Sequence, residues 1–205
     1  MTPLKPDSFW LHILSWLLAL AMVAAIIAGA FVTLAALRPD PQMLQFDATD
    51  ITGVSWGRNF HLTGDDGESH ELADFRGKVV ALYFGYTRCP DVCPTTMATL
   101  GQAVRLLGKD GARVQGLFVT VDPRHDTRGA LRKYVRAFDE DFLGLYGDAA
   151  ATSRTTDEFK VAAGEHHSIP VFLFDASGRL RLVVSPQATA DSIVHDVRLL
   201  LTQSS

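Results

Sequence analysis

The sequence predicts an α/β fold, with a central mixed sheet flanked by helices, behind one N-terminal transmembrane helix. Residues 9–37 contain no Asp, Glu, Lys or Arg, and a membrane-spanning helix needs about 20 consecutive apolar residues. Beyond them, continuous apolar stretches alternate with amphipathic ones, which is typical of strands and helices that share one sheet. The only two cysteines, Cys89 and Cys93, lie where the first long apolar strand gives way to a helix.

Composition excludes several classes of protein. The formal net charge is −4, which argues against a nucleic-acid-binding protein. Two cysteines are too few for a disulfide scaffold or for a zinc site made only of thiolates. A disulfide that closes so short a loop would constrain the unfolded chain little. We therefore expect a chemical or regulatory role for the pair more than a structural one.

The apolar run at residues 9–37 is interpreted as an uncleaved membrane anchor. A cleaved signal peptide is the alternative, because small residues recur in the run, but a signal peptide needs an apolar region of only about 7 to 15 residues. Lys5 precedes the run and Asp40, Asp47 and Asp50 follow it. The positive-inside rule therefore predicts a single-pass protein of the inner membrane, with residues 1–8 in the cytoplasm and the main domain in the periplasm.

Residues 38–49, rich in proline and charge, are expected to be a tether, and residues 50–205 a folded domain. The domain begins with short strand-like pieces at 51–54 and 59–62 and a hairpin turn at 64–67. Residues 78–85 form a continuous apolar run suited to a strand buried on both faces. The helix after Pro94 buries one apolar face and stops at Gly108.

A second buried strand is predicted near residues 114–121, followed by helices at 127–138 and about 149–160. Residues 169–175 and 179–184 read as an antiparallel hairpin, and an amphipathic helix ends the chain. The order β-α-β-α-β-β-α, with the cysteines at the first strand-to-helix junction, describes a thioredoxin-like fold.

The helix at 127–138 and the turn before it carry a basic stripe at steps of four residues. The stripe, Arg124, Arg128, Arg132 and Arg136, is interpreted as a solvated face. A docking surface for an acidic partner is the alternative.

Each cysteine precedes a proline, and the residue before proline avoids α geometry, so neither cysteine is expected inside a helix. Pro94 suits the first helical position, which makes Cys93 the expected N-cap. A helix N-terminus favours a thiolate over a thiol. Two thiolates in one turn either oxidise to a disulfide or bind a soft metal ion.

Seven histidines are present, and surface or packing roles are expected for five of them: His12, His61, His70, His125 and His195. His166 and His167 differ, because they precede the strand that begins near Pro170. In a thioredoxin-like fold the turn entering that strand faces the cysteine turn, and its proline is commonly cis. One of the two imidazoles could complete a Cu(I) site with both thiolates, or a Cu(II) site with a further ligand. It could instead be the base that keeps a thiol ionised.

Residues 83–94, Tyr-Phe-Gly-Tyr-Thr-Arg-Cys-Pro-Asp-Val-Cys-Pro, resemble the signature of the Sco/SenC family. These are membrane-anchored copper proteins that help assemble the dinuclear copper centre of cytochrome c oxidase. The resemblance extends over residues 46–178 and includes the segments 51–53, 59–67, 74–78, 119–123 and 126–127.

The resemblance implies a copper metallochaperone, not an enzyme. Cys89 and Cys93 match the two sulfur ligands of the family, and His167 matches its histidine ligand. Asp122 matches an acidic position near the metal. The implied cofactor is one copper ion, Cu(I) or Cu(II), and the implied partner is the copper-binding subunit of cytochrome c oxidase or another cuproprotein acceptor.

Three departures from the family pattern keep other interpretations open. His166 replaces a usual Asp, so the neighbouring histidines could exchange roles. The segment 160–165 is short, and Pro170 is closer to the thioredoxin pattern. A thiol-disulfide oxidoreductase that reduces a partner's cysteines would need only Cys89 and Cys93. A copper or redox sensor is a third possibility, whereas the peroxiredoxin cysteine pattern is absent.

Overall fold

The computed structural model describes residues 6–36, 45–161 and 169–203. The chain divides into two compact units, Met1–Gln45 and Phe46–Ser205. The first unit holds one helix, α1 (Pro6–Ala36), and its stretch Ile13–Ala30 is long and apolar enough to cross a membrane. A signal sequence has the same properties. The predicted N-terminal apolar helix is confirmed, while its role as an anchor and the domain boundaries remain predictions.

The second unit is an α/β domain. Its strands are β1 (Thr49–Asp50), β2 (His61–Gly64), β3 (Ser69–Glu71), β4 (Val79–Gly85), β5 (Val114–Thr120), β6 (Leu143–Tyr146), β7 (Val171–Phe174) and β8 (Leu180–Val184). Its α-helices are α2 (Val92–Leu107), α3 (Arg128–Arg136), α4 (Ala149–Glu158) and α5 (Ala190–Gln203), with short 3₁₀ turns at Leu72–Phe75 and Gly108–Arg113.

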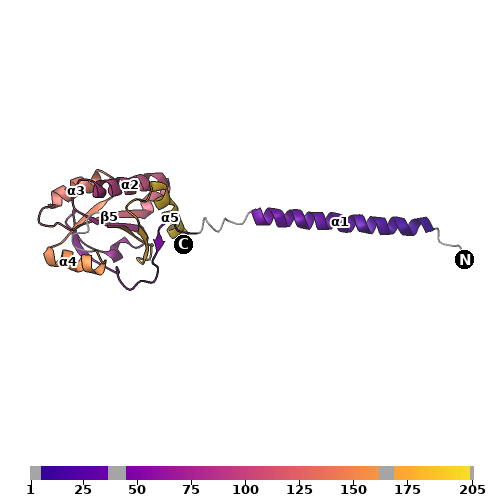
Figure 1. Cartoon of the computed structure of the whole chain (residues 1–205), viewed down its shortest axis with the longest axis horizontal. Helices are drawn as coiled ribbons and strands as arrows, with labels where there is room; N and C mark the ends of the chain where they lie inside the picture. Colours follow the sequence, from indigo (N-terminus) through magenta and orange to yellow (C-terminus); the bar gives the residue numbers. More distant parts are fainter. Residues whose placement is uncertain (1–5, 37–44, 162–168, 204–205) are drawn as a thin grey trace. The chain divides into compact units, whose positions relative to one another are not determined.

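All the strands form one mixed sheet in the order β1-β8-β7-β4-β5-β6-β2-β3. The strand that leads to the cysteines, β4, pairs in parallel with β5 and antiparallel with β7. In Figure 1, α2, α3 and α5 cover one face of the sheet and α4 covers the other. This arrangement confirms the predicted central mixed sheet with flanking helices.

Every residue of β4 is buried, because successive side chains point to opposite faces and both faces are covered. Tyr83 points toward the α2 side, where its ring lies 6.2 Å from that of Phe118. Phe84 points the other way and packs against Phe159 and Phe172, at centroid separations of 5.3 and 5.9 Å. The predicted doubly buried strand is confirmed, and its two sides anchor two halves of the core.

Some elements differ from their predicted places. The segment expected as a strand at 51–54 is a turn, and the edge strand β1 precedes it. Strand β6 was not predicted, because its four residues, Leu-Gly-Leu-Tyr, are few and include a glycine, which is depleted in strands. The hairpin between β2 and β3 and that between β7 and β8 are both confirmed as antiparallel pairs.

The basic stripe is solvent-exposed, but two of its arginines also bind a neighbouring turn. Arg132 Nε lies 3.2 Å from an oxygen of Asp65, whose side chain is 0% exposed. Arg128 Nε donates to the Asp65 carbonyl at 2.8 Å, and its guanidinium also donates to the carbonyl of Asp66. These two arginines therefore hold the β2–β3 turn against α3 while Arg128 stays exposed and Arg132 half-exposed. The predicted solvated face agrees with this exposure, and two of its residues also have a structural role.

Candidate metal centre

The site begins where β4 ends. The Gly85 carbonyl accepts the N–H of Val121 at 2.8 Å, which ties the end of β4 to the end of β5. A Cβ on Gly85 would lie 2.9 Å from Cys93 Sγ and 2.9 Å from the ring of Phe118. Real Cβ atoms essentially never come so close to another heavy atom, so a glycine here lets the strand end approach the sulfur.

A buried carboxylate fixes the turn that follows. Asp126, only 3% exposed, accepts the N–H of Thr87 at 2.9 Å and its hydroxyl at 2.6 Å. It also accepts the hydroxyl of Thr120 at 2.7 Å. The turn two residues before Cys89 is thereby held against the end of β5. Sequence reasoning noticed Asp126 only as part of a family motif, since nothing local shows that it reaches back to Thr87.

The structure places Cys89 in the turn, as predicted, and its N–H donates to the carbonyl of Tyr86 at 3.1 Å. Cys93, however, lies inside α2, whose N-cap is Asp91. The N-cap prediction is wrong because proline is tolerated throughout the first helical turn, where N–H groups have no intrahelical partner. Pro94 therefore occupies the third helical position, and the Cys93 N–H is free to donate to Cys89 Sγ at 3.4 Å.

Both cysteines are free and buried, with exposed fractions of 6% for Cys89 and 1% for Cys93. Burial raises the pKa of the Cys93 thiol to about 12. The expectation of a ready thiolate at this position is wrong, because loss of solvent outweighs the helix N-terminus. Burial also opposes ionisation of Cys89, but hydrogen bonds from the Cys93 thiol and from the backbone of Cys93 and Asp91 lower its pKa. Cys89 is therefore the thiol that ionises first.

Asp122 lies at the rim of the turn. It accepts a hydrogen bond from Arg88 Nη2 at 3.1 Å, and its other oxygen lies 2.8 Å from Nδ1 of His125. The hydrogen bond to His125 lowers the pKa of Asp122 against a partial burial, and Arg88 adds to the effect. Asp122 thus reaches the cysteine turn through the residue that precedes Cys89.

The two candidate histidines, His166 and His167, lie outside the described residues. The chain is described again from Ile169, which is buried, and it then enters β7 beside β4, with Phe172 opposite Leu82. No peptide bond among the described residues is cis, so the expected cis bond before Pro170 is wrong, in line with the ordinary preference for trans. A ligand role for either histidine stays a prediction.

The family is decided by a comparison over most of the folded domain. Residues 49–202 match the family model described as SCO1/SenC. The chain belongs to the SCO1/SenC family. Among its relatives, the bovine "Protein SCO2 homolog, mitochondrial" is 35% identical over 196 residues, covering 89% of this chain and 73% of the relative.

Solved SCO1/SenC structures share the fold. Apo Sco1 of Thermus thermophilus has a TM-score of 0.68 and 36% identity, covering 77% of this chain and 98% of that one. ScoI of Bradyrhizobium japonicum with copper bound has a TM-score of 0.62 and 29% identity, covering 70% of this chain and 98% of that one. The predicted thioredoxin-like fold is confirmed, and homologous structures bind copper.

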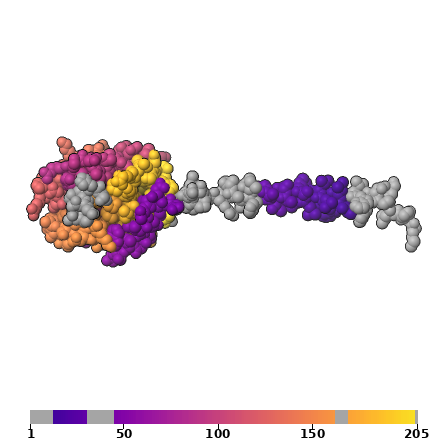
Figure 2. Space-filling view, in the orientation of Figure 1, coloured from indigo at the N-terminus to yellow at the C-terminus, as the bar shows by residue number. Residues whose placement is uncertain are grey.

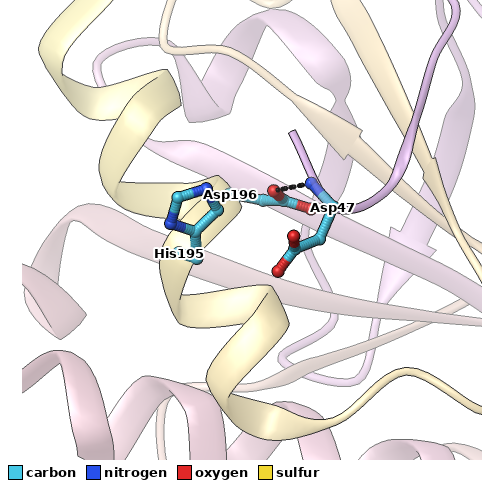
Figure 3. A group of neighbouring side chains, drawn as sticks. All are labelled: Asp47, His195 and Asp196. Atoms are coloured by element: carbon cyan, nitrogen blue, oxygen red, sulfur yellow. Dashed lines mark hydrogen bonds between the residues drawn. The ribbon is translucent and has the colours of Figure 1, made fainter. Parts of the chain in front are cut away.

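The part of this SCO1/SenC chain that the structure describes holds one other group of metal-ligand side chains. Asp47, His195 and Asp196 place ligand atoms within 4.8 Å of one another, as Figure 3 shows. The carboxylate of Asp196, however, already accepts the N–H groups of Asp47 and Ala48, at 2.7 and 2.9 Å. In Figure 2 the start of the domain accordingly lies against α5. Asp196 therefore fastens the start of the domain, and the surface or packing role expected for His195 stays a prediction.

Proposed function

We propose that this chain is a membrane-anchored copper metallochaperone. Cys89 and Cys93 as thiolates and His167 as a neutral imidazole bind one copper ion. The acceptor is the copper-binding subunit of cytochrome c oxidase or another cuproprotein, in assembly of the dinuclear copper centre. The observation that carries the proposal is the pair of free, buried cysteines at one strand–helix junction, in a family whose solved members include copper-bound ones.

The donor set fits copper as the cargo. Thiolates and an imidazole are soft ligands that suit Cu(I). Each thiol that binds the ion must release its proton, so binding depends on pH. Cys89 has the lower pKa and the greater exposure, which makes it the first sulfur to bind an incoming ion. Cys93 then closes the site from the core side.

The proposed function includes a membrane anchor and its orientation. We propose that α1 remains as a single inner-membrane anchor, with residues 1–8 in the cytoplasm, residues 38–49 as a tether and the domain in the periplasm. The apolar stretch Ile13–Ala30 and the position of Lys5 before it support this orientation.

A thiol-disulfide oxidoreductase is the second candidate. The opposite pKa shifts of the two thiols, lowered for Cys89 and raised for Cys93, favour it. A thiol with a lowered pKa, such as Cys89, can attack a partner's disulfide. A buried neighbour such as Cys93 can then resolve the mixed disulfide. This chemistry needs neither His166 nor His167.

Anaerobic competition for Cu(I) separates the two candidates. The reduced full-length chain in detergent is compared with His167→Ala, His166→Ala and Cys89→Ser. His125→Ala serves as a matched control, because His125 also lies near the turn but is held by Asp122. One equivalent bound tightly, and markedly weakened by His167→Ala alone among the histidine variants, supports the chaperone. Affinity no better than that of a simple dithiol peptide, or no dependence on His166 and His167, supports the oxidoreductase instead.

A further inference from the structure

The core side of Cys93 is covered by a tyrosine. Tyr83 lies in the middle of the sheet with 0% of its surface exposed. Its hydroxyl donates a hydrogen bond to Cys93 Sγ at 3.7 Å. Gly85 borders the same sulfur, since a Cβ on Gly85 would lie 2.9 Å from it. Two residues of β4 therefore confine the sulfur on its inner side, and Tyr83 offers it a directed donor.

A second tyrosine in the same aromatic row lacks such a bond. Tyr134 also packs against Phe118, at a centroid distance of 5.1 Å. Its hydroxyl is buried and has no hydrogen-bond partner among the described residues. Burial raises the pKa of Tyr134, and the charges of Cys93 and Cys89, if they ionise, would raise it further. The hydroxyls of these two tyrosines are both buried, but that of Tyr83 binds a sulfur and that of Tyr134 has no partner among the described residues.

A hydroxyl buried in a core costs free energy unless it is hydrogen-bonded. A phenylalanine ring would fill the position of Tyr83 equally well, since Phe84 in the same strand and Phe118 in β5 are also fully buried. The oxygen of Tyr83 is therefore explained by its acceptor, the sulfur, and not by packing. A hydrogen bond to sulfur strengthens when the sulfur becomes negatively charged, which is its state as a metal ligand.

We propose that Tyr83 is a positioning residue for Cys93, whose hydroxyl orients the sulfur and stabilises it as a metal ligand. This inference rests on the proposed function, in that copper is the metal considered. Groups that hydrogen-bond to a metal ligand typically change metal affinity by about 10- to 100-fold when removed. Because the Tyr83 contact is long, we expect the lower end of that range.

The test compares Tyr83→Phe with Tyr134→Phe in the full-length chain in detergent. Each substitution removes one buried oxygen and keeps the ring, so the two are matched in packing. In anaerobic Cu(I) competition, Tyr83→Phe is expected to weaken binding about 10-fold, whereas Tyr134→Phe leaves it unchanged. Equal weakening in both variants would show a general packing effect and would overturn the proposal.

A second readout needs no copper. In a glutathione redox buffer, two glutathione thiols supply the two electrons and two protons that convert a Cys89–Cys93 disulfide into two thiols, and glutathione disulfide forms. Loss of a donor to the reduced sulfur should lower the equilibrium constant for this reduction about five-fold in Tyr83→Phe. Tyr134→Phe should match the wild type.

The two readouts separate the inference from the proposed function. If the wild type binds copper no better than a dithiol peptide, the chaperone proposal fails, and the glutathione equilibrium still decides the role of Tyr83. If Tyr83→Phe equals the wild type in both readouts, the positioning role is wrong whatever the wild type binds.

Discussion

Replacing Asp126 tests whether the cysteine turn is held by one buried carboxylate. Asp126→Ala removes three hydrogen bonds, two from Thr87 and one from Thr120. Hydrogen bonds to charged groups contribute about 1.5 to 3 kcal/mol each, and an unpaired buried N–H costs about 1 to 3 kcal/mol. Because the bonds share one acceptor and are not additive, we expect a loss of about 4 kcal/mol in the free energy of unfolding.

Asp126→Asn should cost only about 1 kcal/mol. Its amide oxygen can take the place of Oδ2, which accepts from Thr87 N and Thr120 Oγ1. Its amide nitrogen can then donate to the Thr87 hydroxyl, which is able to reverse its role. Only the charge is lost.

Urea unfolding of the full-length chain in detergent, followed by circular dichroism, measures both variants. Asp148→Ala serves as a control for the loss of a single exposed hydrogen bond. It removes the carboxylate that accepts the N–H of Ala151 at the start of α4, a bond worth about 1 kcal/mol. If Asp126→Ala is no less stable than Asp148→Ala, or if the Ala and Asn variants agree within about 1 kcal/mol, the carboxylate does not hold the turn.

Three further predictions concern other parts of the domain. Gly85→Ala should weaken Cu(I) binding at least 10-fold in the competition assay, because its Cβ would displace Cys93 Sγ; unchanged affinity would mean that the sulfur can move at no cost. Arg132→Met should lower unfolding stability by about 3 kcal/mol, because it removes the ion pair of the buried Asp65; a neutral result in urea would mean that the N–H of Gly144, which also donates to that carboxylate, is a sufficient partner for it. For Asp175, burial raises the pKa, but hydrogen bonds from Ser177, Arg179 and Arg181 outweigh it and leave the pKa lowered. Its contribution should therefore be complete above an unfolded-state pKa of about 3.9 and be lost as pH falls through the lower folded pKa. The stability difference between wild type and Asp175→Asn should shrink below about pH 4, and a difference that persists at pH 2 would contradict this.

The sequence was informative where local pattern decides structure. Six of the seven residues of β4 are apolar and the seventh is glycine, a pattern that suits a strand covered on both faces. Gly108, at a φ of 60°, ends α2 as expected. Strand β6 could not be found in this way, because its existence depends on pairing with β5 and β2. Long-range pairing leaves little trace in four residues.

The place of the candidate site in the fold could be predicted from the sequence, but the burial of its residues could not. The proline spacing located both cysteines at one junction, but it could not show that Cys93 would be 1% exposed, and burial reverses the expected ease of ionisation. Likewise, the four-residue spacing of the arginines predicted that they share one face of α3. It could not show that the buried Asp65 binds two of them, because Asp65 lies more than 60 residues earlier in the chain. Such partners are set by tertiary contacts alone.

The central place of β4 in the sheet also sets an order of events during synthesis. Its neighbours are β5, which follows soon after the cysteine turn, and β7, which begins only at Val171. A nascent chain that ends before β7 leaves one edge of β4 unpaired, with apolar side chains and backbone groups open to other strands. The proposed ligand His167 comes four residues before that strand begins. A half-made chain that ends before this segment therefore presents two cysteines without the proposed third ligand, and on the proposed function a complete copper site could form only after most of the domain had been made.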